Sequence, residues 1–221
     1  MQLFIDTADV EEARRAAALG VVSGCTTNPK LAAQAGPGDF RRCIERLLEA
    51  CPGPLSVEVV GETVESMLEE AAEYAAWDPR IVVKIPMSLE ALEAVSLLER
   101  QRDVRVNVTC IVSPNQALLA LLAGASYVSL FTGRIADLGA DPAAAIARTA
   151  SFIDDGGFSG RIIAASMRQT ADIGESFAAG AHIVTTPFKF LPALAHHPRT
   201  VETIAEFKSA WDEARSSGDL A

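Results

Sequence analysis

Short apolar runs alternate along this chain with longer stretches of helical periodicity, and this alternation restricts the possible folds more than any other feature. The runs are Leu3 to Ile5, Val21 to Cys25, Leu55 to Val60, Ile81 to Ile85, Val104 to Val112, Tyr127 to Phe131, Arg161 to Ala165 and Ile183 to Thr186. Strands that alternate with helices form parallel sheets, because each helix returns the chain to the same edge. Eight such units predict an α/β fold, a single (β/α)8 TIM barrel. A doubly wound open sheet is the alternative.

The length of 221 residues suits one barrel, and no linker or low-complexity tract divides the chain. We therefore expect a single domain over residues 1–221, with an additional C-terminal helix over 200–216. In that helix Ile204, Phe207 and Trp211 share one face, at i, i+3 and i+7. This apolar stripe must be covered, either by the same barrel or by a neighbouring subunit.

Residues typical of helix N-termini occur at the positions where the alternation of strands and helices predicts that helices begin. Ser113 followed by Pro114 predicts an N-cap and a first helical residue, and Asp141 before Pro142 repeats the pattern. Asp9 with Glu12 resembles a capping box.

Charge and composition exclude several classes of protein. The 29 acidic and 19 basic residues give a net charge of -10, which would repel nucleic acid. No apolar run approaches the roughly 18 residues of a membrane span, and the N-terminus lacks a basic leader, so we expect a cytoplasmic protein without a membrane partner. The 4 cysteines contain no C-x-x-C pair and the 3 histidines lack metal-ligand spacing, which favours reduced thiols and no metal site.

Alternating side chains on a barrel strand face the helices and the lumen in turn. In the fifth run one face carries Val104, Val106 and Val108, and the other carries Arg105, Asn107 and Thr109. Polar residues on one face also occur near the ends of the other runs, namely Asp6, Glu58, Lys84, Ser129, Ser166 and Arg168. Because barrel sites form at the carboxyl ends of the strands, these side chains predict one shared pocket. Individually, Asp6 also suits a turn cap, and Ser129 also suits a narrow part of the barrel.

Lys84 is the most informative of these residues, because it places a long cation inside the apolar run Ile81 to Ile85. Burying an ammonium is unfavourable unless it is paired or neutralised, and a neutral amine is a nucleophile that forms imines with carbonyl compounds. The protonated imine withdraws electrons and permits cleavage of a nearby carbon–carbon bond. The alternative is a structural ion pair with Glu58 or Asp6.

Imine chemistry on a phosphorylated sugar needs further groups, and the sequence offers candidates for each. Asp6 or Glu58 is suited to proton transfer. The candidates for binding hydroxyl groups are Asn28, Asn107, Thr109 and Ser129, and those for binding phosphate are Arg134, Ser166 and Arg168. For either arginine alone, a surface salt bridge is the alternative.

Over nearly its whole length the sequence resembles the transaldolases, specifically the small-subunit group that includes fructose 6-phosphate aldolase. The motifs that carry the resemblance are Phe4-Ile5-Asp6-Thr7-Ala8, Gly24-Cys25-Thr26-Thr27-Asn28-Pro29, Ser56-Val57-Glu58-Val59, Val82-Val83-Lys84-Ile85-Pro86, Asn107-Val108-Thr109, Ser113-Pro114-Asn115-Gln116-Ala117, Tyr127-Val128-Ser129 through Gly133-Arg134, and Ala164-Ala165-Ser166-Met167-Arg168. Each motif alone is weak evidence for this family, but the occurrence of all eight in the same order is specific to it.

The resemblance implies a role for each candidate. Lys84 would be the Schiff-base lysine and Asp6 the acid and base, while Glu58 and Thr109 would hold the water that relays protons. Substrate would be bound by Thr26, Asn28, Asn107, Ser129, Phe131, Arg134, Ser166 and Arg168, the last three at its phosphate. The implied reaction transfers dihydroxyacetone from fructose 6-phosphate or sedoheptulose 7-phosphate to erythrose 4-phosphate or glyceraldehyde 3-phosphate, in the non-oxidative pentose phosphate pathway and without cofactors.

Two positions favour the transferase over the aldolase branch, in which the family pattern has Gln in place of Glu58 and Tyr in place of Phe131. Departures from the family pattern are Cys110 to Val112, Met167, and Gln169 with Thr170. The resemblance also implies a homo-oligomer, a pentamer or a decamer, with Phe207 and Trp211 at a subunit interface. The rival functions are a catalytically silent binding barrel and an isomerase that uses Glu58 as its base.

Overall fold

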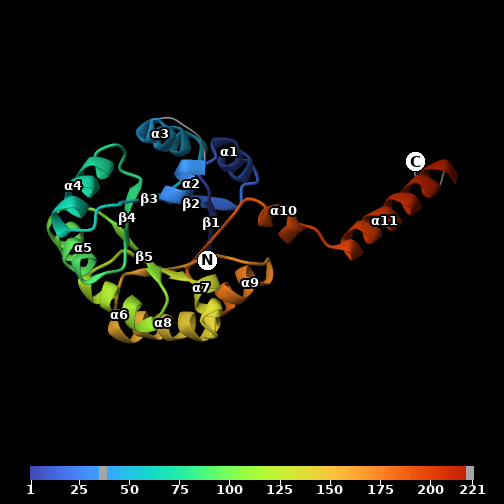
Figure 1. Ribbon diagram of the computed structural model, residues 1–221. Coiled ribbons are helices and arrows are strands. Elements are labelled where there is room, and N and C mark those ends of the chain that lie inside the picture. Colours follow the sequence, from blue (N-terminus) through green and yellow to red (C-terminus); the bar gives the residue numbers. More distant parts are fainter. Residues whose placement is uncertain (35–38, 218–221) are drawn as a thin grey trace. The chain divides into compact units, whose positions relative to one another are not determined.

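The centre of the fold is a closed barrel of parallel strands (Figure 1). The structure, a computed structural model, describes residues 1–34 and 39–217. The strands are β1 (Gln2–Asp6), β2 (Val22–Thr26), β3 (Leu55–Glu58), β4 (Ile81–Pro86), β5 (Val106–Ile111), β6 (Tyr127–Phe131), β7 (Arg161–Ala165) and β8 (Ile183–Thr186). Each strand pairs with the next along the chain, and β8 pairs with β1. The predicted barrel is therefore confirmed, and the open-sheet alternative is wrong.

Helices surround the ring of strands (Figure 1). Their bounds are α1 (Val10–Ala18), α2 (Pro29–Gln34), α3 (Phe40–Ala50), α4 (Val64–Ala75), α5 (Leu89–Gln101), α6 (Pro114–Ala123), α7 (Thr132–Asp137), α8 (Pro142–Gly156) and α9 (Ala171–Ala178). The chain divides into two compact units, Met1–Phe188 and Lys189–Ala221. The second unit contains α10 (Phe190–Ala195) and α11 (Pro198–Ser217), so the predicted C-terminal helix is confirmed. Its place at a subunit interface stays a prediction.

The predicted helix starts are present, with one correction. The side chains of Ser113 and Asp141 accept hydrogen bonds from the first turns of α6 and α8. Asp9 accepts from the backbone N–H groups of Glu11 and Glu12 and so caps α1. The reciprocal half of the predicted capping box is absent from the described contacts, because the Glu12 carboxylate accepts instead from the Thr7 hydroxyl at 2.7 Å.

A second correction concerns the fifth strand, which begins at Val106 rather than at Val104. Arg105 therefore precedes the strand and is exposed, and its guanidinium donates to the carbonyl of Pro79 at 3.2 Å. At the amino end of the barrel a guanidinium reaches solvent without crossing the core, so Arg105 does not share the lumen with Asn107 and Thr109.

The lumen is closed below its polar residues by an apolar layer. Phe4, Val82, Tyr127, Ile163 and Ile183 form one buried cluster. Each lies two residues before a lumenal position nearer the carboxyl end of its strand, the positions of Asp6, Lys84, Ser129, Ala165 and Thr185. Gly24 makes room for this layer, since a Cβ there would stand 2.6 Å from the Phe4 ring. The polar layer can therefore open only toward the carboxyl ends of the strands.

Glu99 on α5 joins the amino ends of β5 and β6. Its Oε1 accepts from the backbone N–H groups of Val106 at 2.6 Å and Ser126 at 2.7 Å, and its Oε2 accepts from the Ser126 hydroxyl at 3.0 Å. Glu99→Ala leaves these donors without their acceptor and should lower the free energy of unfolding by about 2–4 kcal/mol. Chemical denaturation measures this, with the exposed Glu93→Ala on the same helix as control. Equal stability of the two variants would contradict the assignment.

Two further predictions from composition can be compared with the fold. Within residues 1–34 and 39–217, no helix has both the length and the apolar character that a bilayer crossing requires. Cys25, Cys43, Cys51 and Cys110 are all free thiols, as the absence of a C-x-x-C pair predicts.

Candidate active site

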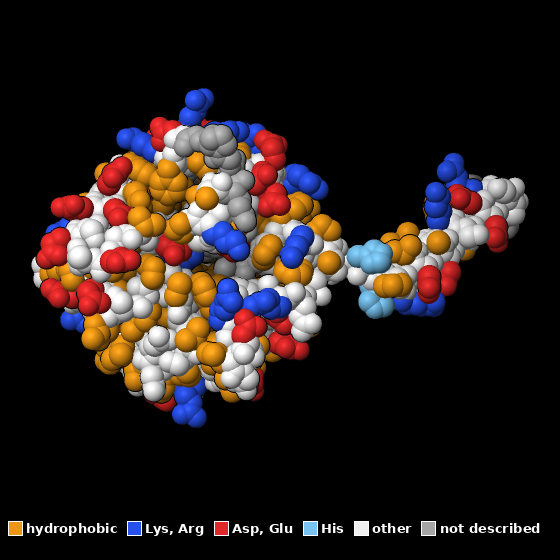
Figure 2. All heavy atoms as spheres, viewed as in Figure 1, with side chains coloured by type: hydrophobic (Ala, Val, Ile, Leu, Met, Phe, Trp, Pro, Cys, Tyr) orange, Lys and Arg blue, Asp and Glu red, His pale blue; other side chains and the backbone are white. Residues whose placement is uncertain are grey.

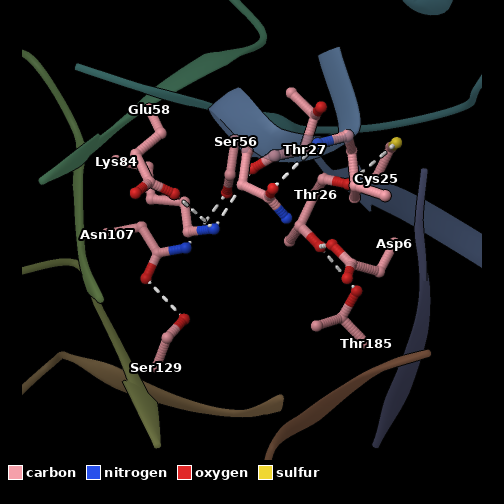
Figure 3. Close-up of polar contacts among 12 residues, drawn as sticks. Asp6, Cys25, Thr26, Thr27, Ser56, Glu58, Lys84, Asn107, Ser129 and Thr185 are labelled. Carbon is pink, nitrogen blue, oxygen red and sulfur yellow. Dashed lines mark hydrogen bonds and ion pairs between the residues drawn. The ribbon is translucent and has the colours of Figure 1, made fainter. Parts of the chain in front are cut away.

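Lys84 lies in the lumen, with its ammonium between two oxygen groups (Figure 3). Only 5% of the residue is exposed. Its Nζ is 2.9 Å from Glu58 Oε2 and donates to the carbonyl oxygen of Thr27 at 3.1 Å. The register of β3 with β4 places Glu58 directly beside Lys84. The ion pair considered from the sequence therefore exists, and it gives the ammonium proton an adjacent acceptor.

Asp6 faces the same space from β1 and takes part in a separate hydrogen-bonded group (Figure 3). The Thr26 hydroxyl donates to Asp6 Oδ1 at 2.7 Å. The hydroxyls of Thr26 and Thr185 are also 2.7 Å apart. Asp6 and Thr26 are direct neighbours in the register of β1 and β2, so strand pairing sets this contact. The alternative in which Asp6 caps a turn finds no support among the described contacts.

The environment of Asp6 changes its acidity. Burial raises the pKa of Asp6 above its ordinary value, because a carboxylate loses hydration in the lumen, whereas the Lys84 charge and the Thr26 hydrogen bond lower it in part. A carboxyl with a raised pKa is a stronger base once it is ionised. Asp6 is thus suited to exchange protons with a substrate hydroxyl.

A third group consists of Ser129, Asn107 and Ser56, all buried. The Ser129 hydroxyl donates to Asn107 Oδ1 at 2.7 Å, and Asn107 Nδ2 donates to Ser56 Oγ at 3.2 Å. Thr109, on the same strand as Asn107, has a buried Oγ1 without a partner among the described residues. Such an atom needs a ligand or a water, because an unsatisfied buried hydroxyl costs free energy.

The three groups border a cavity of about 140 Å³ at the carboxyl end of the barrel. Its lining consists of Asp6, Thr26, Asn28, Lys84, Ser129, Phe131, Ala165, Ser166 and Thr185. Asn28 also accepts from the backbone N–H of Leu31 at 3.0 Å, which fixes its side chain at the start of α2. The cavity therefore brings an amine, a carboxyl and several hydroxyl groups to one small space.

The two arginines predicted to bind phosphate meet at one carboxylate. Asp137 Oδ2 is 2.7 Å from Arg168 Nη2 and 3.5 Å from Arg134 Nη1. Figure 2 shows several Lys and Arg side chains around the centre of the barrel face, with acidic side chains beside them. Ser166 lines the cavity, whereas neither arginine belongs to its lining among the described residues. The surface salt bridge considered as the alternative for each arginine therefore exists, with Asp137 as the shared acceptor, and phosphate binding stays a prediction.

Backbone geometry holds Arg134 and Arg168 close to the cavity. Ser166 has a φ of 65°, in the left-handed region that residues other than glycine seldom adopt. At Gly133 a Cβ would overlap the carbonyl oxygen of Ser166 and the side chain of Arg168. The start of α7 and the end of β7 therefore pack together only because residue 133 has no side chain.

Three residues of this site are not among those predicted from the sequence. Ser56 and Thr185 face the lumen, and Asp137 joins the two arginines. The alternation that identifies Glu58 on β3 also identifies Ser56 two residues earlier. The same alternation puts Thr185 on the lumenal face of β8. Asp137 gives no comparable signal, because its contacts arise between α7 and the segment after β7.

The fold and the site define a (β/α)8 barrel with a buried lysine and two carboxyl groups at the carboxyl ends of its strands. Residues 3–219 match the family described as Transaldolase/Fructose-6-phosphate aldolase. A probable transaldolase of Desulforudis audaxviator is 46% identical over 211 residues, covering 96% of this chain and 97% of that protein. A probable transaldolase of Moorella thermoacetica is 44% identical over 216 residues, covering 98% of this chain and 100% of that protein. The chain therefore belongs to the transaldolase/fructose-6-phosphate aldolase family.

Proposed function

We propose that this protein is a transaldolase that moves a dihydroxyacetone unit between sugar phosphates through an imine on Lys84. The donors are fructose 6-phosphate or sedoheptulose 7-phosphate, and the acceptors are erythrose 4-phosphate or glyceraldehyde 3-phosphate. The observation that carries the proposal is the buried Lys84 amine on the wall of a 140 Å³ cavity that Asp6 also lines. Family membership and the relatives named probable transaldolase support the same reaction.

Imine formation begins with loss of the Lys84 proton, for which Glu58 at 2.9 Å is the nearest carboxylate. The free amine attacks the ketone carbon of the donor, and the resulting carbinolamine loses water to give the protonated imine. Thr109, whose buried hydroxyl has no partner among the described residues, is suited to bind the water that carries protons between Glu58 and the reacting carbon.

Cleavage then requires a base at the donor hydroxyl on the far side of the bond that breaks. Ionised Asp6 takes that proton, the carbon–carbon bond breaks, and its electron pair moves into the imine to give an enamine. The aldehyde leaves, an acceptor aldehyde enters, and the same steps run in reverse. Asn28, Asn107 and Ser129 are suited to bind the hydroxyl groups of the dihydroxyacetone unit.

The phosphate end of the substrate is assigned to Arg134, Ser166 and Arg168. In this proposal the substrate phosphate replaces the Asp137 carboxylate as partner of the two guanidinium groups. The pathway, the cytoplasmic location and the pentameric or decameric assembly, with Phe207 and Trp211 at its interface, stay predictions of the family resemblance.

Phe131 on the cavity wall favours transfer over release of free dihydroxyacetone. A phenylalanine offers no hydroxyl to position water at the enamine, so the intermediate should persist until an aldehyde arrives. Glyceraldehyde 3-phosphate release from fructose 6-phosphate is expected to stop after one equivalent per site without erythrose 4-phosphate, and to turn over with it.

Phe131→Tyr is the matched variant for this experiment, because it adds only a hydroxyl. It should increase the release that occurs without acceptor. Equal turnover of the unmodified protein with and without erythrose 4-phosphate would instead identify a fructose 6-phosphate aldolase, and Phe131 and Glu58 would not distinguish the two activities.

A further inference from the structure

Three oxygen atoms from neighbouring strands form a chain at the cavity wall. Thr26 Oγ1 on β2 lies 2.7 Å from Asp6 Oδ1 on β1 and 2.7 Å from Thr185 Oγ1 on β8. Strand β1 lies between β2 and β8 in the barrel, so both threonines converge on the end of the strand that carries Asp6. Thr26 and Thr185 are each 2% exposed. Figure 3 shows the three side chains together, across the space from Lys84 and Glu58.

The number of available hydrogens fixes the direction of this chain. An ionised carboxylate only accepts, so the single hydroxyl hydrogen of Thr26 must point to Asp6. Thr26 then has nothing to donate to Thr185, and the contact between them requires Thr185 to donate to Thr26. The order is therefore Thr185 to Thr26 to Asp6 Oδ1. Among the described residues, Oδ2 has no hydrogen-bond partner that competes with a substrate.

The groups that surround Asp6 determine how much the Asp6 carboxylate depends on this chain of hydrogen bonds to stay ionised. Across the lumen Lys84 on β4 supplies the positive charge. On β2 the neighbouring Cys25 is a buried thiol whose own pKa is raised by a hydrogen bond with Cys51 and by burial, with a smaller contribution from Asp6. On β8 the neighbour that reaches Asp6 through Thr26 is the hydroxyl of Thr185. The hydrogen bond from Thr26 is the only side-chain hydrogen bond to Asp6 among the described residues, and it opposes the effect of burial.

We infer that Thr185 is a positioning residue which, through Thr26, holds Asp6 ionised and turned with Oδ2 toward the substrate hydroxyl. The inference rests on the proposed role of Asp6 as the base. Hydrogen bonds in a chain polarise one another, so a Thr26 hydroxyl that accepts from Thr185 is a better donor to Asp6. Thr185 touches no reacting atom in this scheme and acts only through Thr26.

Thr185→Val, which exchanges the hydroxyl for a methyl group at similar volume, tests the inference. Activity requires ionised Asp6, and loss of the chain should raise the pKa of Asp6, so the acidic limb of the kcat/KM profile should move to higher pH by about 0.3–0.5 unit. On that limb kcat/KM should fall about two- to threefold, with the loss in kcat rather than in KM. Thr185→Ser restores the hydroxyl and should restore the profile.

Thr186→Val is the control on the same strand. The Thr186 hydroxyl is buried without a partner among the described residues, so its removal should leave the profile unchanged. If Thr185→Val matches Thr186→Val, or if Thr185→Ser resembles Thr185→Val, the inference is wrong. Should the valine variant fail to fold, Thr185→Ala removes the same hydroxyl with less crowding and is judged by the same shift.

An infrared titration of the Asp6 carboxyl, identified by its absence in Asp6→Asn, separates this inference from the proposed function. Absence of transaldolase turnover in the unmodified protein would overturn the function. The carboxyl titration would still be measurable, and an identical Asp6 transition in Thr185→Val would overturn the role of Thr185 by itself.

Discussion

Replacement of Lys84 by methionine is expected to lower turnover of fructose 6-phosphate with erythrose 4-phosphate by at least about four orders of magnitude, because the nucleophile of the proposed mechanism is lost. Borohydride reduction in the presence of fructose 6-phosphate should attach a reduced dihydroxyacetone unit to Lys84 of the unmodified protein. Mass spectrometry should find no such adduct on the variant. Lys208→Met, which changes an exposed lysine on α11, should retain both turnover and trapping.

The fold should survive this change, although stability responds to the broken ion pair. Methionine has a length similar to lysine and suits the apolar strand, but it leaves Glu58, with 12% of its side chain exposed, without its partner at 2.9 Å. Removing one partner of a buried pair destabilises a protein, whereas replacing both charges is often neutral. Adding Glu58→Gln to Lys84→Met should therefore recover thermal stability without recovering activity.

Two outcomes would contradict this assignment of Lys84. An adduct that forms equally in Lys84→Met would place the imine on another lysine. A variant that is unfolded by circular dichroism, and that Glu58→Gln does not rescue, would give Lys84 a structural role.

The barrel was predictable because strand periodicity and helix caps are local properties of the sequence. Alternation along β5 separated Val106 and Val108 from Asn107 and Thr109, and all four lie in the strand. The predicted strand start was two residues too early, because Val104 and Arg105 continue the alternation although they precede the first paired residue. A guanidinium at a strand end reaches solvent, so alternation alone does not place Arg105 in the lumen.

Contacts within the site depend on register between strands, which the sequence pattern does not specify. The chain from Thr185 through Thr26 to Asp6 joins the first two strands to the last one, and Thr185 is 159 residues from Thr26. The closure of β8 against β1 brings them together. The predicted barrel implies that closure, but only the structure supplies its register. Asp137 is a similar case, since the bond to Arg168 spans 31 residues between α7 and the segment after β7, both outside the sheet.

Simultaneous substitution of Arg134 and Arg168 by glutamine is expected to raise the KM for fructose 6-phosphate about a hundredfold. In the proposed complex, the phosphate dianion loses two charge-assisted hydrogen-bonding partners, each contributing about 1.5–3 kcal/mol before solvent screening. Arg148→Gln on the exposed face of α8 is the matched control and should have no effect. Steady-state kinetics measures both results.

Asp137 should not prevent phosphate binding in the unmodified protein. The side chains of Arg134, Arg168 and Asp137 are 64%, 54% and 50% exposed, so their ion pairs are screened by water and contribute little stability. A phosphate dianion carries more charge than a carboxylate and is able to bind both guanidinium groups. Asp137→Asn removes the competing carboxylate and should lower the KM for fructose 6-phosphate severalfold, without changing kcat.

Unphosphorylated donors distinguish phosphate binding from a general role of the arginines. Imine trapping with dihydroxyacetone, which lacks phosphate, should be equally efficient in the unmodified protein and in the double glutamine variant. The kcat/KM of the unmodified protein for fructose 6-phosphate should also fall as salt rises, and more steeply than that of the double variant, because ionic screening weakens the attraction between the arginines and the phosphate. If the double variant lost as much activity with unphosphorylated donors as with phosphorylated ones, the two arginines would maintain the shape of the cavity mouth rather than bind the phosphate. An unchanged KM would place the phosphate elsewhere on the barrel.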